Sequence, residues 1–319
     1  MATLTFHGAT RQVTGSCYLL ETAHSRVLIE CGLFQGPPDV DRLNERPFPF
    51  KPRDIHAVVL SHAHLDHSGL LPRLKREGFD GKVYATTQAL ELLDIMLKDA
   101  AHIQEKDAEW ENRRRERSGK ELVAPLYTLQ DAEDVLTLGE PLVYGQKTRI
   151  TQDIEICLRD AGHILGSAIV ELWIDADGRQ KKIVFSGDLG NAATPLLRDP
   201  EIVRSADVLL LESTYGDRDH RPLPETLKEF ADILAQAEHD VSIEDGRLAA
   251  AAGLPIDVAR SRVMTCGNPS MSRDVRRALA ARGFAPVRRN TPGQMTFENY
   301  WQNPPGAERT PAAPGAITP

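Results

Sequence analysis

The sequence predicts an α/β fold in which strands and helices form packed layers. Short apolar runs of the buried-strand type occupy the first 60 residues and recur between residues 154 and 211. The stretch between them, residues 87–135, is predicted to be mainly helical, because its apolar residues recur about every 3.6 positions among dense charges. Strands, then helices, then strands again in one chain favour a layered sandwich.

Each expected element rests on a local pattern. Residues 16–21 and 25–30 are predicted to form a hairpin, and Asp177-Gly178 is a strong turn between two later strands. Gly78 ends the helix that follows the fourth strand. The expected strands are 3–6, 16–21, 25–30, 55–60, 154–158, 167–174, 182–185 and 206–211, and the expected helices are 70–77, 87–135 and 224–237.

Composition excludes several classes of protein. Charged residues (26%) and hydrophobic residues (41%) are ordinary for a globular chain, and no apolar run approaches the roughly 18 residues that span a bilayer. The N-terminus lacks the pattern of a signal peptide. Four widely spaced cysteines without a CxxC pair indicate reduced thiols in a cytoplasmic protein. The net charge of −8 counts mildly against a polyanionic substrate, although a local basic groove can hold phosphate in an acidic protein.

A change in composition near residue 240 predicts two unlike parts. Residues 241–319 contain ten arginines, six acidic residues and no lysine, whereas all ten histidines lie before residue 240. The end of the chain is rich in Pro, Ala and Gly, which is typical of disorder. We therefore expect a domain at 1–240, a second fragment at 241–303 and a disordered tail at 304–319.

The strongest chemical signal follows the strand expected at 55–60. His62, His64, Asp66 and His67 lie within six residues, a spacing that ten histidines in 319 residues rarely produce by chance. Imidazole and carboxylate are the usual ligands of catalytic zinc. A loop at a strand end can direct the first two side chains to one metal and the next two to a second. Two such metals can activate water and stabilise a displaced oxygen, so the segment predicts a two-metal hydrolase site.

Further ligands are expected at other strand ends. His163 lies in a glycine-bracketed turn at residues 160–167, and Asp188 follows the strand expected at 182–185. Alone, each would more often be an ordinary turn residue. Together with the histidine cluster, both fit ligands delivered from successive strand ends.

Six segments resemble, in order, the motifs of one family: HGATRQVTGSCYLLE, LIECGLFQG, SHAHLDHSGLLPRL, DAGHILGSA, FSGDLG and LLLESTYGDRDH. Through them, residues 1 to about 240 resemble the metallo-β-lactamase fold and, within it, the β-CASP branch of RNA-processing nucleases. Their order and spacing match over more than 200 residues. The resemblance implies an α/β fold of the αββα sandwich type, truncated before the β-CASP cassette and followed by an appended α/β fragment.

The resemblance also implies two zinc ions and roles for single residues. Asp66 would orient the attacking water and, with His163, assist proton handling. Glu30 falls where the family usually has a supporting aspartate, and its extra methylene is expected to weaken that support. Glu212 matches the acidic residue that opens the β-CASP region and is expected to hydrogen-bond near the site. The implied ligands are His62, His64 and His163 for one ion, Asp66 and His67 for the other, and Asp188 bridging both.

The resemblance stops near residue 240. The family supplies two further histidines downstream, but the last histidine here is His239, so the second zinc site lacks an expected ligand. Residues 244–301 instead resemble the C-terminus of bacterial ferredoxin/flavodoxin–NADP⁺ reductases, in which Cys266 would face the nicotinamide and Trp301 would stack near the flavin. The flavin domain is missing, so we expect no reductase activity and interpret the join as a fused or misassembled reading frame.

Three hypotheses for function follow. The first is a zinc-dependent β-CASP hydrolase that cleaves RNA phosphodiester bonds as an endonuclease or exonuclease, in the cytoplasm and away from membranes. The second is a metal-binding but catalytically incompetent remnant, because the downstream histidines are missing. The third is a small-molecule thioester or lactam hydrolase, which the motif around Glu212 argues against.

Overall fold

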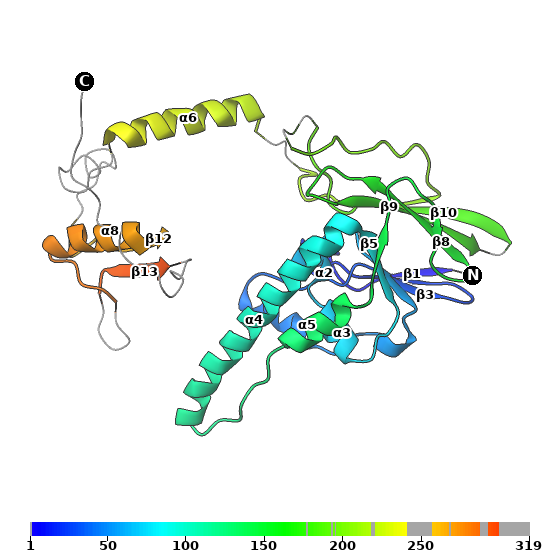
Figure 1. Cartoon of the computed structure of the whole chain (residues 1–319), viewed down its shortest axis with the longest axis horizontal. Coiled ribbons are helices and arrows are strands. Elements are labelled where there is room, and N and C mark those ends of the chain that lie inside the picture. The colour runs from blue at the N-terminus through cyan, green and yellow to red at the C-terminus, as the bar shows by residue number, and fades with distance from the viewer. Residues whose placement is uncertain are drawn as a thin grey trace. The chain divides into compact units, whose positions relative to one another are not determined.

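The computed structural model describes residues 2–176, 178–192, 194, 196–217, 221–240, 257–267, 269–287 and 293–299. The chain divides into two compact units, residues 1–219 and 220–319 (Figure 1). This boundary lies before the helix α6 (Leu223–Asp240), whereas the change in composition lies after it.

The first unit is a sandwich of two sheets. In the first sheet, six strands lie in chain order. β1, β2 and β3 pair antiparallel, and β3 to β6 pair parallel, so the carboxyl ends of β3 and β4 meet at one edge. The strands are β1 (Thr3–Phe6), β2 (Tyr18–Glu21), β3 (Arg26–Ile29), β4 (Ala57–Val59), β5 (Lys82–Thr86) and β6 (Gly139–Leu142).

The second sheet has five strands in the order β11-β10-β9-β8-β7. β7 to β10 form an antiparallel meander, and β11 joins β10 in parallel at the edge. The strands are β7 (Thr148–Arg149), β8 (Ile154–Asp160), β9 (Ala168–Ala176), β10 (Arg179–Phe185) and β11 (Val208–Leu210).

The middle of the first sheet, at β3 and β4, is buried on both faces. Along β3, Val27 and Ile29 belong to the core between the two sheets, while Leu28 belongs to the core beneath the helices. On β8, Ile154 and Ile156 contribute to the same intersheet core. Burial of both faces explains why the first strands of the sequence are continuous apolar runs instead of alternating patterns.

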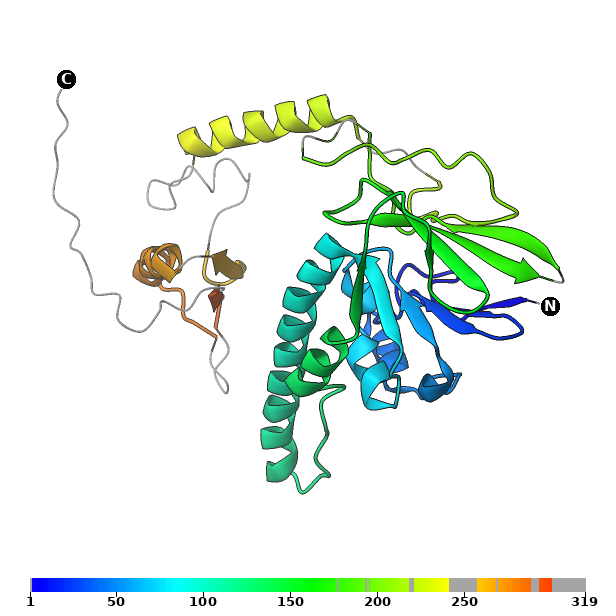
Figure 2. The ribbon, with the colours of Figure 1, turned by 45° about the vertical axis from the view of Figure 1, so that its right-hand side comes forward.

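Three helices, α3, α4 and α5, cover the outer face of the first sheet (Figure 2). The long helix α4 begins after Thr86, whose hydroxyl accepts the backbone N–H of Ala89. A capping box between Thr128 and Asp131 opens α5, so the region predicted to be helical over 87–135 is two helices. The helices of this unit are α1 (Pro38–Asp41), η1 (Arg42–Glu45), η2 (Pro52–Asp54), α2 (Leu65–Ser68), α3 (Leu71–Arg76), α4 (Thr87–Arg117) and α5 (Leu129–Leu136).

The outer face of the second sheet is covered in another way. Leu189 and Val203, from the long connection between β10 and β11, pack against Ala161, Ile169 and Val184. A second helix layer, which the αββα arrangement implies, does not occur among the described residues of the first unit. The connection takes its place as the cover for these apolar side chains.

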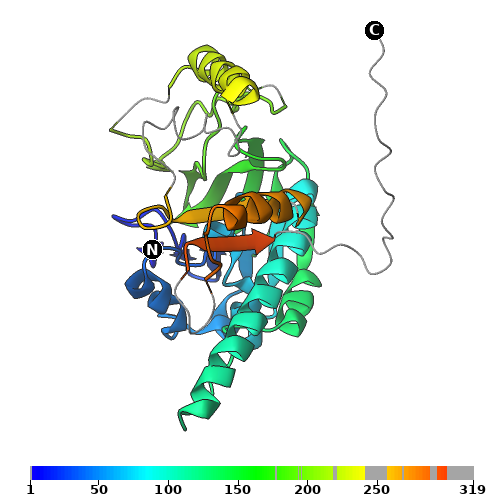
Figure 3. The same cartoon turned by 90° about the vertical axis from the view of Figure 1, so that its left-hand side faces the viewer.

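The second unit contains α6 and a small pair of parallel strands. α8 packs on β12 and β13 around Leu279, Phe284 and Met295 (Figure 3). The reductase resemblance of this part of the chain stays a prediction. Trp301 and the expected disordered tail lie outside the described residues. The elements are β12 (Val263–Gly267), α8 (Pro269–Ala281) and β13 (Met295–Asn299).

Three short strands of the first unit, β5, β6 and β7, were absent from the expected elements. The four residues of β6 include Gly139 and Pro141, which are depleted in strands, and the strand lies at a sheet edge where proline is tolerated. Cys17, Cys31 and Cys157 are free and buried, in line with their wide spacing. Within the described ranges, every helix is too short or too polar to cross a membrane.

Candidate metal centre

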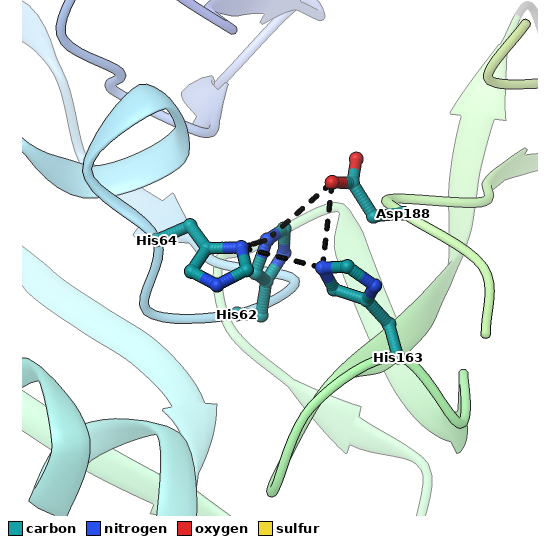
Figure 4. Close-up of side chains that lie close together, drawn as sticks. All are labelled: His62, His64, His163 and Asp188. Carbon is teal, nitrogen blue, oxygen red and sulfur yellow. Dashed lines mark hydrogen bonds and ion pairs between the residues drawn. The ribbon is translucent and has the colours of Figure 1, made fainter. Parts of the chain in front are cut away.

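The predicted ligands lie at the ends of strands from both sheets. His62 and His64 follow β4, and α2 then carries Asp66 and His67. His163 follows β8, and Asp188 follows β10. The fold brings all six residues together, and Figure 4 shows four of them pointing toward one another: His62, His64, His163 and Asp188.

These four residues form what we call the first donor set. His64 Nδ1 lies 3.0 Å from His62 Nε2 and 3.2 Å from His163 Nε2. Asp188 Oδ2 lies 3.5 Å from His163 Nε2 and 3.8 Å from His62 Nε2. Zinc bonds of about 2.0 to 2.1 Å in a tetrahedron place neighbouring donors about 3.3 to 3.4 Å apart. The observed separations bracket this spacing, so the first donor set fits one tetrahedral ion.

Ser61 fixes the tautomer of His62. The Ser61 hydroxyl donates to Glu30 Oε2 over 3.0 Å and lies 2.9 Å from His62 Nδ1. Because the hydroxyl has a single proton, its oxygen must accept the bond from His62 Nδ1–H. The lone pair of His62 is therefore on Nε2, the atom that faces the first donor set. A ligand oriented through its other ring nitrogen is typical of protein metal sites.

Asp66, His67 and Asp188 form a second donor set. Asp188 Oδ1 lies 3.3 Å from His67 Nε2, and Asp66 Oδ2 lies 3.6 Å from the same nitrogen. The two oxygens of Asp188 therefore face different sets, Oδ2 the first and Oδ1 the second. This is the arrangement by which one carboxylate can bridge two ions.

Glu30 helps to hold both donor sets in place through hydrogen bonds to Ser61 and His67. Its carboxylate accepts the Ser61 N–H at 2.5 Å and the His67 Nδ1–H at 2.6 Å, besides the Ser61 hydroxyl. The extra methylene that was expected to weaken this support still reaches every partner. Glu30 is fully buried with a φ of 63°, a strained value for a non-glycine residue that surrounding contacts must impose. Glu30, His62 and His67 also lie close enough to hold an ion, but these hydrogen bonds already occupy the Glu30 oxygens.

The two donor sets differ in the pKa values of their histidines. Burial, and then the charge of His67, keep the pKa of His62 well below its ordinary value, so this imidazole stays neutral at pH 7. Burial also acts to lower the pKa of His67, but its hydrogen bonds to Asp188 and Glu30 outweigh burial and raise that pKa to about 10. Burial acts to raise the pKa of Asp188, and the bond from His67 outweighs it and lowers that pKa. Without metal, His67 is therefore a cation held between carboxylates.

Glu212 and two glycines hold the ligand loops in place. The Glu212 carboxylate accepts the N–H of Leu189 at 2.8 Å, next to Asp188 in the chain. A Cβ on Gly32 would lie 1.7 Å from the carbonyl oxygen of Asp66, so only glycine allows these segments to meet. Gly190 makes the same close approach to the turn that carries His163.

A cavity of about 600 Å³ opens beside the second donor set. Its walls include His67, Asp188 and Glu212, together with Arg11 from a loop that the sequence analysis left without a function. The only signal for this loop was its place in the first family motif. The remaining lining residues are Phe6, Ala9, Thr10, Gln12, Val13, Ser16, Tyr18, Phe185, Gly187, Leu209, Leu210, Leu211, Ser213 and Thr214.

Comparison with known proteins gives consistent matches. Residues 10–153 match the metallo-beta-lactamase superfamily. Ribonuclease TTHA0252 of Thermus thermophilus is 41% identical over 71% of this chain and 47% of that protein. The transcription termination factor FttA of Methanococcus maripaludis is 35% identical over 72% of this chain and 34% of that protein. The chain thus spans about half the length of the first relative and a third of the second.

Among solved structures, MEM-A1, a subclass B3 metallo-beta-lactamase from a soil metagenome library, gives a TM-score of 0.33 at 17% identity, covering 54% of this chain and 56% of that one. The sequence match, the two-sheet sandwich and the ligands at its strand ends carry the assignment. The first unit therefore contains a metallo-beta-lactamase superfamily domain, matched over residues 10–153.

Proposed function

We propose that the first unit binds two zinc ions and hydrolyses phosphodiester bonds of RNA, as a β-CASP nuclease does. The observation that carries the proposal is the position of Asp188, with one oxygen facing each donor set beside an open cavity. A ribonuclease and a transcription termination factor among the relatives support RNA as the substrate class. The free, buried thiols of Cys17, Cys31 and Cys157 support a cytoplasmic location.

Each residue of the centre then has a role. Bound zinc would supply the Lewis acidity that activates water and stabilises a phosphate oxygen. Asp66, whose side chain is 22% exposed, would orient the attacking water and accept its proton. His163, a member of the first donor set, would assist in moving that proton. Glu212 keeps Asp188 in place through the N–H of Leu189.

The test combines metal analysis with cleavage. We expect about two zinc ions per chain by elemental analysis and cleavage of labelled single-stranded RNA, with 5′ and 3′ labels separating endonucleolytic from exonucleolytic products. Asp66→Asn should reduce cleavage by roughly a hundredfold or more, because a positioned base contributes on that order. Asp94→Asn is the matched control, since Asp94 is an exposed carboxylate on α4. RNA left intact by zinc-loaded protein would contradict the proposal.

A metal-binding protein without turnover is the second candidate. It is favoured by the second donor set, which has one histidine where the first has three. Zinc bound without cleavage, and a zinc content that His67→Ala leaves unchanged, would establish it. Faster turnover of a chromogenic lactam or thioester than of RNA would point instead to a small-molecule hydrolase.

A further inference from the structure

Among the described residues, Arg11 is the only lysine or arginine that lines the cavity beside the metal centre. The other ionisable groups that line it are Tyr18, His67, Asp188 and Glu212. Arg11 is exposed and forms no ion pair with any residue in the described part of the chain, so its guanidinium has all its donors available. A phosphodiester strand entering this cavity needs positive charge beyond that of the metals, because the chain as a whole carries −8.

The loop that carries Arg11 is anchored directly to the metal centre. At its end, the Ser16 N–H donates to the carbonyl oxygen of Asp66 over 2.8 Å, and the Ser16 carbonyl accepts the Gly32 N–H over 2.8 Å. Gly15, just before it, lies so close to the Phe34 ring that a Cβ would come within 2.4 Å. Movement of the loop is therefore restrained relative to Asp66.

Residues with a strained backbone lie at this cavity and at the metal centre. Among the described residues, the non-glycine positions with positive φ are Ala9 (47°), Arg11 (63°) and Glu30 (63°). Ala9 and Arg11 line the cavity, and Glu30 orients His67. Strained conformations of this kind cost about 1 to 3 kcal/mol each and persist where surrounding contacts impose them, mostly at functional sites.

We propose that Arg11 binds a non-bridging phosphate oxygen of the strand whose scissile phosphate lies at the metal centre. The guanidinium fork suits two phosphate oxygens at once, which positions the strand as well as attracting it. Arg11 is thus a substrate-positioning residue. The identity of the strand as RNA rests on the proposed function.

The experiment measures binding and turnover separately on the zinc-loaded full chain. A short fluorescein-labelled phosphorothioate RNA reports affinity by anisotropy across a series of salt concentrations, and unmodified RNA reports kcat and KM. Arg11→Ala should weaken binding about tenfold and lower the salt dependence by about 0.7 in slope, as expected for one lost phosphate contact on a single strand. Arg11→Lys should retain the salt slope but regain only part of the affinity, because the fork is lost.

Arg179→Ala is the matched control, because Arg179 is an exposed arginine at the end of β10 opposite to Asp188. Zinc content and thermal midpoint should be equal in all variants. Unchanged affinity and salt slope for Arg11→Ala would overturn the inference, and if that variant still cleaved RNA the proposed function would stand. Loss of binding in Arg11→Ala together with an inactive wild type would instead overturn the proposed function, and only the contact between Arg11 and phosphate would stand.

Discussion

The two donor sets share Asp188, but they differ in how closely their donor atoms surround the metal position and in charge. The first set has four donor atoms within 4.8 Å of one another, three of them imidazole nitrogens. Asp66, His67 and Asp188 form no such tight group among the described residues, and His67 and Asp188 border the cavity. Sites closed by protein ligands suit firm metal binding, whereas sites with an open position suit catalysis. From this contrast we expect the first set to retain metal and the second set to contact substrate.

Breaking the first set should have the largest effect. His64→Ala removes the nitrogen that lies 3.0 Å from His62 Nε2 and 3.2 Å from His163 Nε2, which leaves those donors without a closed site. We expect loss of most bound zinc and a fall in RNA cleavage of about a thousandfold. Elemental analysis and initial rates check this. His24→Ala, in an exposed hairpin turn, should match the wild type, and full zinc content in His64→Ala would remove the distinction between the sets.

Breaking the second set alone should separate binding from turnover. His67→Ala deletes the only imidazole there but leaves the first donor set intact, so we expect about one zinc ion per chain and cleavage reduced by roughly a hundredfold. The buried Glu30 carboxylate also loses a hydrogen bond, so the thermal midpoint should fall. Zinc titration followed by calorimetry distinguishes one binding event from two. Loss of both ions would show that the sets bind as one unit.

Glu30 offers a way to weaken both sets without deleting a ligand. Glu30→Gln keeps the size of the side chain but places an amide N–H₂ where one of the donors Ser61 N–H or His67 Nδ1–H needs an acceptor. We expect zinc affinity to fall about 10- to 100-fold, the usual effect of losing such a supporting group. Competition with a chelator measures it. Glu140→Gln, an exposed carboxylate on β6, is the control, and an unchanged affinity would show that Glu30 only fills space.

The sequence indicated the candidate ligands, and the family resemblance implied how they divide between two ions, but the difference in charge and exposure between the two sets needed the structure. His62 to His67 were found because they cluster, and His163 and Asp188 because each follows a predicted strand. The contact between Glu30 and Ser61 could not be predicted, because it depends on the parallel register that sets Ile29 opposite Val59. The resemblance implied a bridging Asp188, but which of its oxygens faces which set, and where the Arg11 loop lies, depend on the loops of both sheets in three dimensions.

Proton linkage gives the finest test of the contrast. In the metal-free protein the pKa of His67 is raised to about 10, so at pH 7 a metal must displace its proton, whereas burial and neighbouring histidines lower the pKa values of His62 and His64. The affinity of the second set should therefore rise about tenfold per pH unit between pH 7 and 8.5, while that of the first set stays nearly constant.

The raised pKa of His67 also makes the stability of the metal-free protein depend on pH. Protonated His67 stabilises the fold fully below its ordinary pKa of 6.5, and this contribution is lost as pH rises through about 10.

Chelator competition at several pH values, repeated with His67→Ala, measures how the zinc affinity of each donor set depends on pH. The variant should lose the strongly pH-dependent zinc binding of the second set and keep the nearly constant zinc binding of the first set. If both ions showed the same pH dependence in the wild type, the electrostatic difference between the two donor sets would not survive metal binding.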